Sequence, residues 1–232
     1  FARGTADPGV EPGSILLGTT APPEGSAIAR GLDAYLGHVN ARGGVAGRRL
    51  ELVVREAADP ETAIEATREL VESDRVFAVI SQAGTEQALA ARGYLAARRV
   101  PQLFVASGAS AFAGGRRSLG FQPSARAEGE VYGRYVARTL GRARVAVLVR
   151  LGDGEGGELL AGLRKGLAGS RSTVVAVAEY EDGETTLLAR ITALRAARVG
   201  VLAVIAEPDA ATQAFAAIRR LRWSPHLLVG SD

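Results

Sequence analysis

Two hydrophobic patterns follow each other repeatedly along the chain. Short apolar runs, each as long as one buried strand, precede stretches in which apolar side chains recur every three or four positions. The first pattern is typical of strands covered on both faces of a parallel sheet, and the second of helices with one buried face. The predicted strands are 15–18, 50–54, 76–80, 102–105, 145–149, 173–178, 199–205 and 227–229.

The intervening stretches carry helix signals of their own. Within 28–39, apolar residues stand at i, i+4, i+8 and i+11, which places them on one helix face. The next helix has a start signal, because Asp59 stands at the N-cap position and Pro60 in the first turn. Alternating strands and helices predict an α/β fold with right-handed crossovers.

The alternation is interrupted once, between Ala106 and Ser124, by a segment rich in Gly, Ser and Ala. We interpret this segment as the crossing between two lobes of similar build. Lobe I would span 14–120 and lobe II 121–232, after a loose, Gly- and Pro-rich leader at 1–13. The second lobe stops just after a predicted strand, so we expect the chain to be truncated at its C-terminal end.

Composition narrows the class of protein. Hydrophobic residues make up 47% of the 232, enough for a packed core, and no apolar run approaches the roughly 18 residues of a membrane span. The net charge of +3 comes with acids interleaved among the arginines, which disfavours nucleic-acid binding. The absence of Cys excludes disulfides and thiolate metal sites, and two isolated His residues do not suggest a metal cluster. With no Met at the start, we expect that a leader, such as an export signal, has been removed.

One motif suggests nucleotide chemistry. Residues 152–157 match G-x-G-x-x-G between a predicted strand and a helix, and Glu179 follows about twenty residues on, where a ribose-binding acid is expected. Two residues separate the strand from the first glycine, however, and Asp153 and Glu155 would place negative charges beside a pyrophosphate. A nucleotide-dependent Rossmann enzyme therefore remains the alternative hypothesis.

Other catalytic patterns are missing from the sequence. His38 stands within a predicted helix and His226 at a strand entry, and neither accompanies a nucleophile in a G-x-S-x-G setting. The sequence holds no G-x-x-x-x-G-K-[ST] phosphate loop. We therefore expect no enzyme, no catalytic residue, no metal site and no cofactor.

A distributed pattern is more specific. Its most specific stretches are NARGGVAGRRL (40–50) and VPQLFVASGAS (100–110); EAADPETA (56–63), QPS (122–124) and EGEVYGRY (128–135) support it in the same order and spacing. From about Ile15 to Asp232 the chain resembles the type I periplasmic substrate-binding proteins of branched-chain amino-acid ABC transporters. The resemblance implies two Rossmann-like lobes that close on a small ligand, which a membrane permease then receives.

The resemblance also implies ligand-binding residues in lobe I. The family's hydroxyl residue at the start of the helix after strand three maps to Thr85, next to Gly84. A helix N-terminus offers unpaired N–H groups and a positive dipole end to a carboxylate. The plain alternative is that Thr85 only caps the helix. A second family element, after strand four, maps to Ala106, Ser107 and Gly108, where small residues let a ligand approach the backbone.

In lobe II the family's pattern is altered. Glu155 stands where the family often has an aromatic side chain, Glu207 maps near a second aromatic or polar position, and a family acid maps near Ser231 or Asp232. Glu155, Glu207 and Asp232 could hold an ammonium group, or they could be solvated loop acids. Because the aromatics are missing, the family's side-chain selectivity does not carry over.

The favoured hypothesis is an extracytoplasmic solute-binding protein for an amino acid or similar small carboxylate. The partners expected from the resemblance are an ABC permease and, for tethering, a lipid anchor upstream of Phe1. The location would be periplasmic or extracellular. A further alternative is the sensor portion of a receptor that has the same two lobes and no permease.

Overall fold

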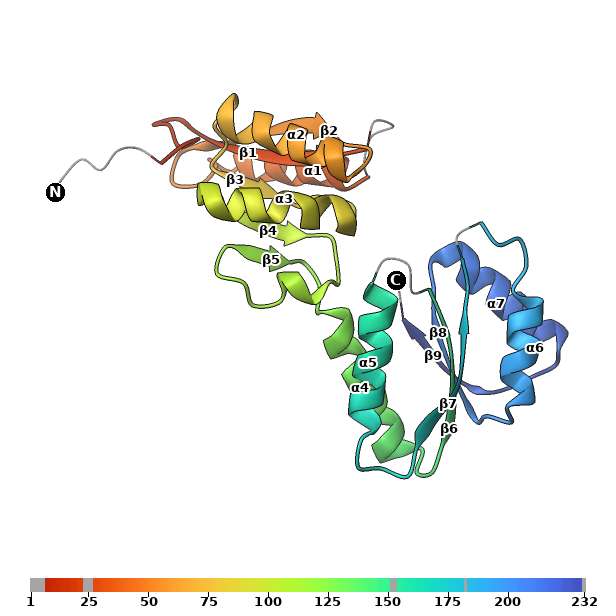
Figure 1. Cartoon of the computed structure of the whole chain (residues 1–232). Helices are drawn as coiled ribbons and strands as arrows, with labels where there is room; N and C mark the ends of the chain where they lie inside the picture. The colour runs from red at the N-terminus through yellow and green to blue at the C-terminus, as the bar shows by residue number, and fades with distance from the viewer. Residues whose placement is uncertain (1–6, 23–26, 151–153, 182, 231–232) are drawn as a thin grey trace. The chain divides into compact units, whose positions relative to one another are not determined.

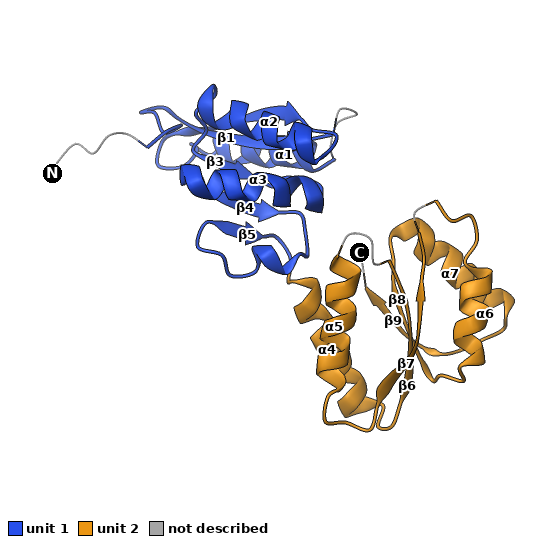
Figure 2. Ribbon diagram, in the orientation of Figure 1, with its two compact units in different colours: residues 1–122 blue, residues 123–232 orange. Residues whose placement is uncertain are grey.

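The computed structural model describes residues 7–22, 27–150, 154–181 and 183–230. The chain divides into two compact units, Phe1–Gln122 and Pro123–Asp232 (Figure 2). Each unit is built on a parallel sheet flanked by helices (Figure 1). This confirms the predicted α/β class. Within the described residues, no helix is long and apolar enough to be a membrane span.

Unit 1 contains β1 (Ser14–Ala21), α1 (Ala27–Asn40), β2 (Arg49–Glu56), α2 (Pro60–Glu72), β3 (Ala78–Ile80), α3 (Thr85–Arg98), β4 (Gln102–Val105), the short 3₁₀ helix η1 (Ser110–Phe112) and β5 (Ser118–Gly120). Its strands lie in the order β2-β1-β3-β4-β5. The direction of winding reverses between β1 and β3. In open α/β sheets, such a reversal leaves a crevice at the carboxyl ends of the strands, where ligands bind.

Unit 2 contains α4 (Ala125–Thr139), β6 (Arg144–Val149), α5 (Glu155–Leu167), β7 (Thr173–Glu179), α6 (Leu188–Ala196), β8 (Val201–Ile205), α7 (Pro208–Arg220) and β9 (His226–Gly230). Its strand order is β7-β6-β8-β9, so the reversal falls between β6 and β8. Both units therefore use the same winding scheme.

All eight predicted strands are present, and β4 has the predicted bounds. The prediction missed β5, because its three residues, Ser-Leu-Gly, carry no apolar run. It pairs with β4 at the edge of the sheet, where β4 shifts register around Phe104. Phe104 has a φ of +57°, a left-handed conformation that is unusual for a bulky residue and marks a bulge.

Local signals at two chain segments are informative. Asp59 forms the predicted N-cap of α2, since its Oδ1 accepts from the Thr62 backbone N–H at 2.8 Å.

The described half of the expected leader is hydrogen-bonded to the rest of unit 1. The Leu16 N–H donates to the Gly9 carbonyl at 2.8 Å, and Arg48 Nε donates to the Glu11 carbonyl at 3.1 Å.

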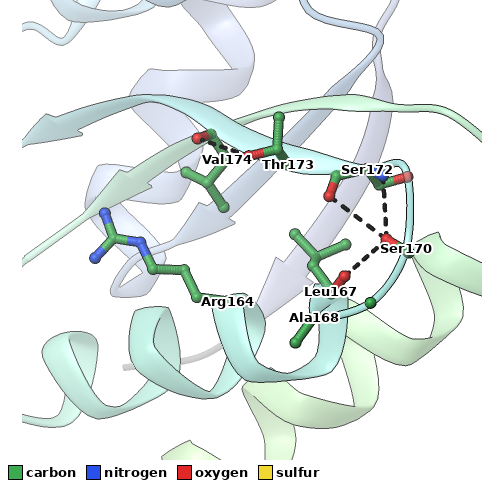
Figure 3. A pocket seen from close by; sticks show the side chains of 8 residues that line it. Arg164, Leu167, Ala168, Ser170, Ser172, Thr173 and Val174 are labelled. Atoms are coloured by element: carbon green, nitrogen blue, oxygen red, sulfur yellow. Dashed lines mark hydrogen bonds between the residues drawn. The ribbon is translucent and has the colours of Figure 1, made fainter.

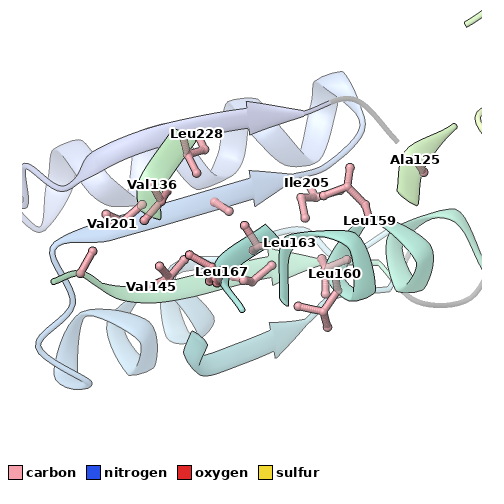
Figure 4. Close-up of a cluster of buried hydrophobic side chains, with 14 residues drawn as sticks. Ala125, Val136, Val145, Leu159, Leu160, Leu163, Leu167, Val201, Ile205 and Leu228 are labelled. Carbon is pink, nitrogen blue, oxygen red and sulfur yellow. The ribbon is translucent and has the colours of Figure 1, made fainter. Parts of the chain in front are cut away.

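The core of unit 2 covers both faces of its sheet. Alternate residues of β6 and β8 pack under α4 and α5 on one face, as Figure 4 shows, and under α6 and α7 on the other. Unit 1 has three smaller clusters, the largest around Leu70 and Leu95 where α2 and α3 meet the sheet. Helix α1 buries only Leu36.

Candidate functional site

The ends of β3 and β4 lie side by side at the carboxyl edge of the unit 1 sheet. Beyond β3, the Gln82 carbonyl accepts from the Ala106 N–H at 3.1 Å, and Ala83 pairs with Ala106 in a parallel bridge. The predicted residues after strand three and after strand four are therefore neighbours. The sequence separates them by about twenty positions, and parallel pairing brings them together.

Two predicted hydroxyl residues are in direct contact there. Thr85 Oγ1 donates to Ser107 Oγ at 2.9 Å, and Ser107 Oγ also accepts from the Ala109 N–H at 3.0 Å. Ser107 is buried and Thr85 is half-buried. Gly108 is also buried, and Ala106 is half-buried. The structure thus assembles the lobe I residues of the prediction into one cluster.

Thr85 is not the cap of α3. The N-cap is Gly84, with φ +85°, and Thr85 is the first helical residue. Gly84 has no side chain that could accept from the amides of the first turn. A helix N-terminus of this kind offers N–H donors and a positive dipole end to an anion. The capping alternative therefore does not describe Thr85, and its role in binding a ligand stays a prediction.

In unit 2, the predicted Glu155 and Glu207 follow β6 and β8, the two strands between which the winding reverses. Glu155 is the first residue of α5 and is only 7% exposed, so it is not a solvated loop acid. Glu207 is the N-cap of α7, and its side chain is 52% exposed. Asp232, with Ser231, lies outside the described residues.

The charge of Glu207 is already opposed within unit 2. Arg150 Nη2 lies 3.0 Å from Glu207 Oε1, and the Arg150 side chain is only 17% exposed. The Glu207 backbone N–H donates to the hydroxyl of the buried Tyr180 at 3.2 Å. Sequence reasoning gave no site role to Arg150 or Tyr180. The available signal was that Arg150 follows a predicted strand directly and Tyr180 comes two residues after another.

A hollow of about 340 Å³ lies at this carboxyl edge of unit 2, and most of its polar lining is acidic. Its polar lining includes Tyr180, Glu181, Glu184, Glu207, Asp209 and Gln213. Arg190 lies against Glu184 and lowers the pKa of its carboxyl. Arginines thus face Glu184 and Glu207, and Glu181 and Asp209 add two further acids to the lining, a surrounding better suited to a cationic group than to an anion.

A second acid lies where β9 ends. Tyr132 Oη is 2.5 Å from Glu128 Oε1 and 3.0 Å from the Val229 carbonyl, so α4 is tied to the end of the strand. Burial, and then the hydrogen bond to Glu128, raise the pKa of the Tyr132 hydroxyl. The hydroxyl therefore stays protonated at neutral pH and acts as a donor.

The glycine motif at 152–157 has structural explanations where it is described; residues 151–153 lie outside the described part. Gly154 has φ +81°, and a Cβ on Gly156 would stand 1.8 Å from the Arg150 carbonyl oxygen. Glu155, a buried acid, is the first residue of α5, at the helix start that a pyrophosphate would need. These features weigh against the dinucleotide alternative.

The histidines and a second hollow contribute no site. His38 stacks near Tyr35 and His226 near Tyr135, and no group of three potential ligands for a metal occurs among the described residues. The hollow in Figure 3, about 380 Å³ in volume, lies at the amino end of β7. Ser170 there donates to the Leu167 carbonyl at 2.7 Å. It is at the opposite edge of the sheet from Glu207.

Several solved structures share this fold. The fatty acid ABC transporter substrate-binding protein from Thermomonospora curvata gives a TM-score of 0.78 at 20% identity, over 96% of this chain and 58% of its own. For a substrate-binding periplasmic protein from Ralstonia solanacearum, the TM-score is 0.76 at 25% sequence identity, over 93% of this chain and 63% of that protein's chain. For the substrate-binding protein LivJ from Streptococcus pneumoniae, in complex with isoleucine, the TM-score is 0.77 at 18% sequence identity, over 93% of this chain and 64% of LivJ.

The chain thus spans about three fifths of the length of these structures. A search of curated protein sequences gave no match. The sequence itself matches one family over residues 16–230, nearly its whole length. The chain belongs to the periplasmic binding protein family.

Proposed function

We propose that this chain is the ligand-capturing part of an extracytoplasmic solute-binding protein that serves an ABC permease and binds an amino acid or a related small carboxylate. The observation that carries the proposal is the contact of Thr85 with Ser107 at the start of α3. This hydroxyl pair lies beside the backbone amides of the first turn of α3, and O–H and N–H donors at a helix start suit a carboxylate.

The acids of unit 2 favour an amino acid over a plain carboxylic acid. Asp209 is an exposed acid that lines the hollow at the carboxyl edge of that unit, beside Glu207, whose charge Arg150 already opposes. An amino acid carries both groups that these residues suit, a carboxylate for the donors of unit 1 and an ammonium group for the acids of unit 2. Solved structures of this fold include one named for fatty acids and one holding isoleucine, so the fold alone does not select the ligand.

Binding, not catalysis, is the expected activity. Hydrogen bonds to charged groups contribute roughly 1.5–3 kcal/mol each, and three or four of them, less the ordering cost, are compatible with micromolar affinity. Closure of two lobes about a hinge would enclose the ligand. The proposed partner is a permease, and the proposed location is periplasmic or extracellular, with tethering by an upstream lipid anchor as an additional expectation.

Titration calorimetry with L-isoleucine, L-glutamate and octanoate tests the ligand class. We expect the amino acids to bind in the micromolar range and octanoate to bind more weakly, because octanoate has no ammonium group. Binding of octanoate alone would show that the acids of unit 2 do not hold an ammonium group. A complete protein that binds none of a wide panel of carboxylates would contradict the proposal.

Thr85→Val tests the site. The substitution keeps the side-chain shape and removes the hydroxyl, so we expect affinity for the amino acid that binds to fall about ten- to a hundredfold. Thr192→Val is the matched control, because the Thr192 hydroxyl is exposed and donates to the Leu188 carbonyl of its own helix. Equal affinities of the two variants would remove Thr85 from the site.

A further inference from the structure

Four buried polar side chains form a hydrogen-bond chain across the sheet of unit 1. Ser118 Oγ donates to Gln102 Oε1 at 3.1 Å, Gln102 Nε2 donates to Gln82 Oε1 at 2.7 Å, and Gln82 Nε2 donates to Thr20 Oγ1 at 3.1 Å. The residues come from β5, β4, the end of β3 and β1, which is their order in the sheet. Their exposures are 6%, 0%, 0% and 2%. We call this set the amide chain.

One backbone carbonyl sets the direction of the amide chain. Gln102 Nε2 also donates to the carbonyl of Ala88, the fourth residue of α3, at 2.9 Å. Because a carbonyl can only accept, the nitrogen of Gln102 must face α3, and its oxygen must face Ser118. The second N–H of Gln102 then meets the oxygen of Gln82, so the nitrogen of Gln82 points to Thr20. Reversing Gln102 would set its oxygen against the Ala88 carbonyl, and reversing Gln82 alone would set its nitrogen against the nitrogen of Gln102.

Glutamines are costly residues to bury. A buried amide without hydrogen-bond partners is strongly destabilising, and an apolar side chain of similar volume would fill the space without that requirement. The benefit of an amide is directional, because its bonds require particular positions of the groups that it joins. Here it joins α3 to β4 through Ala88, and β4 to β5 through Ser118.

The groups joined by the amide chain also carry the candidate site. The Gln82 carbonyl accepts from the Ala106 N–H, and the Ala88 N–H donates to the carbonyl of Gly84 at 3.0 Å. The amide chain therefore links the start of α3, which bears Thr85, to the segment after β4, which bears Ser107. A small shift of α3 along the sheet would alter the distance between those two hydroxyls.

We propose that Gln82 and Gln102 are positioning residues of the ligand site. They hold the first turn of α3 at the position along the sheet where the Thr85 hydroxyl contacts the Ser107 hydroxyl. This rests on the proposed function for its effect on affinity. Its effect on the helix start is independent of any ligand. In metal sites, groups that orient the ligating side chains without touching the metal typically change its affinity by 10–100-fold, and we expect about tenfold here.

The test is Gln102→Leu in the complete chain, with amide hydrogen exchange as the first measurement. Loss of the bond to Ala88 should speed exchange at the Ala88 amide and its neighbours in the first turn of α3 by at least about tenfold relative to the rest of unit 1. Affinity for L-isoleucine should fall about tenfold. Thr20→Val, a milder change at the other end of the amide chain, should give the same pattern with smaller effects if Gln102→Leu does not fold.

Ser172→Ala is the matched control. Ser172 is a buried polar residue of unit 2 that accepts from the Ala143 N–H at 2.9 Å and donates to the Gly141 carbonyl at 2.6 Å. It should lower stability without faster exchange at α3 or weaker binding.

The outcomes separate the two proposals. Wild-type protein that binds neither L-isoleucine nor octanoate counts against the proposed ligand class, while faster local exchange in Gln102→Leu still supports positioning of α3. Unchanged local exchange in both amide-chain variants overturns the positioning role, whatever their stability. Faster exchange with unchanged affinity for L-isoleucine overturns the link to the site.

Discussion

Glycines within helices have different reasons for being there in the two units. In unit 1, a Cβ built on Gly31, Gly37 or Gly93 would meet nothing within 4 Å. In unit 2, a Cβ on any of four helical glycines would come within 2.0–2.4 Å of the facing helix backbone; these are Gly129, Gly133, Gly162 and Gly166. Helices α4 and α5 therefore pack backbone against backbone.

The two sheets also differ in the kind of side chain that they bury. β6 and β8 are buried and apolar from Val145 to Val149 and from Val201 to Ile205. The sheet of unit 1 instead buries the amide chain beneath α3. The comparison shows that close packing places the elements of unit 2, whereas directional hydrogen bonds also place those of unit 1, beside the candidate carboxylate site.

The largest expected effect is that of Gly162→Val. Its Cβ would stand 2.1 Å from the Arg126 carbonyl oxygen, so α4 and α5 must separate. We expect unit 2 to lose at least about 3 kcal/mol of unfolding free energy. Trp223, the sole tryptophan, packs against the core of unit 2, so its fluorescence during denaturant unfolding measures the change. A variant as stable as wild type would contradict the conclusion that close packing of α4 against α5 places the elements of unit 2.

The next effect contrasts two leucines. Leu194 of α6 is 2% exposed within the large cluster of unit 2, and Leu194→Ala should cost about 2–5 kcal/mol. Leu36 is the one buried residue of α1, so Leu36→Ala should lie at or below the lower end of that range. Urea unfolding followed by circular dichroism measures both. An equal or larger cost at Leu36 would show that unit 1 is packed as closely as unit 2.

Gly93→Ala should stabilise the protein. Gly93 is exposed in the interior of α3, and alanine is favoured over glycine there by about 0.8–1 kcal/mol. Thermal unfolding should show a small upward shift of the midpoint. A downward shift would mean that α3 needs this glycine, as α5 needs Gly162.

The smallest effect concerns the polar start of α2. Hydrogen bonds from Thr62, first from its backbone N–H, lower the pKa of Asp59. The stabilisation is therefore present above the unfolded-state pKa of about 3.9 and is lost as the pH falls through the lower folded-state value. Asp59→Asn keeps a good N-cap residue without the charge. The stability difference between wild type and variant should shrink as the pH falls toward 2, in thermal unfolding measured from pH 7 to pH 2. A difference that does not change with pH would remove the role of the charge.

Some of the site could be predicted and some could not. The family resemblance pointed both to Thr85 at a helix start and to Ser107 after the fourth strand. The hydrogen bond between the two was not predictable, because it depends on the pairing of Ala83 with Ala106. Likewise, Arg150 and Glu207 are far apart in sequence and meet only because β6 and β8 are neighbours.

The fold divides in a similar way. The order of strands and helices could be predicted, because each buried strand is an apolar run and apolar residues recur every three or four positions along each helix. β5 was not, because Ser118–Gly120 forms a strand only by pairing with β4. The glycines of α4 and α5 can be read from the sequence. The close approach of the two helix backbones, which requires these glycines, cannot.

The sequence by itself determined the α/β class, the succession of elements and the helix start at Asp59, because these depend on residues within a turn or two of each other. Tertiary structure alone decided which polar groups meet. In the sequence, Gln82 is a polar residue after one predicted strand and Gln102 opens another, and neither shows its partners; parallel pairing and the docking of α3 bury both. The reason is that hydrogen bonds between distant residues depend on strand register and crossover geometry, which no local pattern encodes.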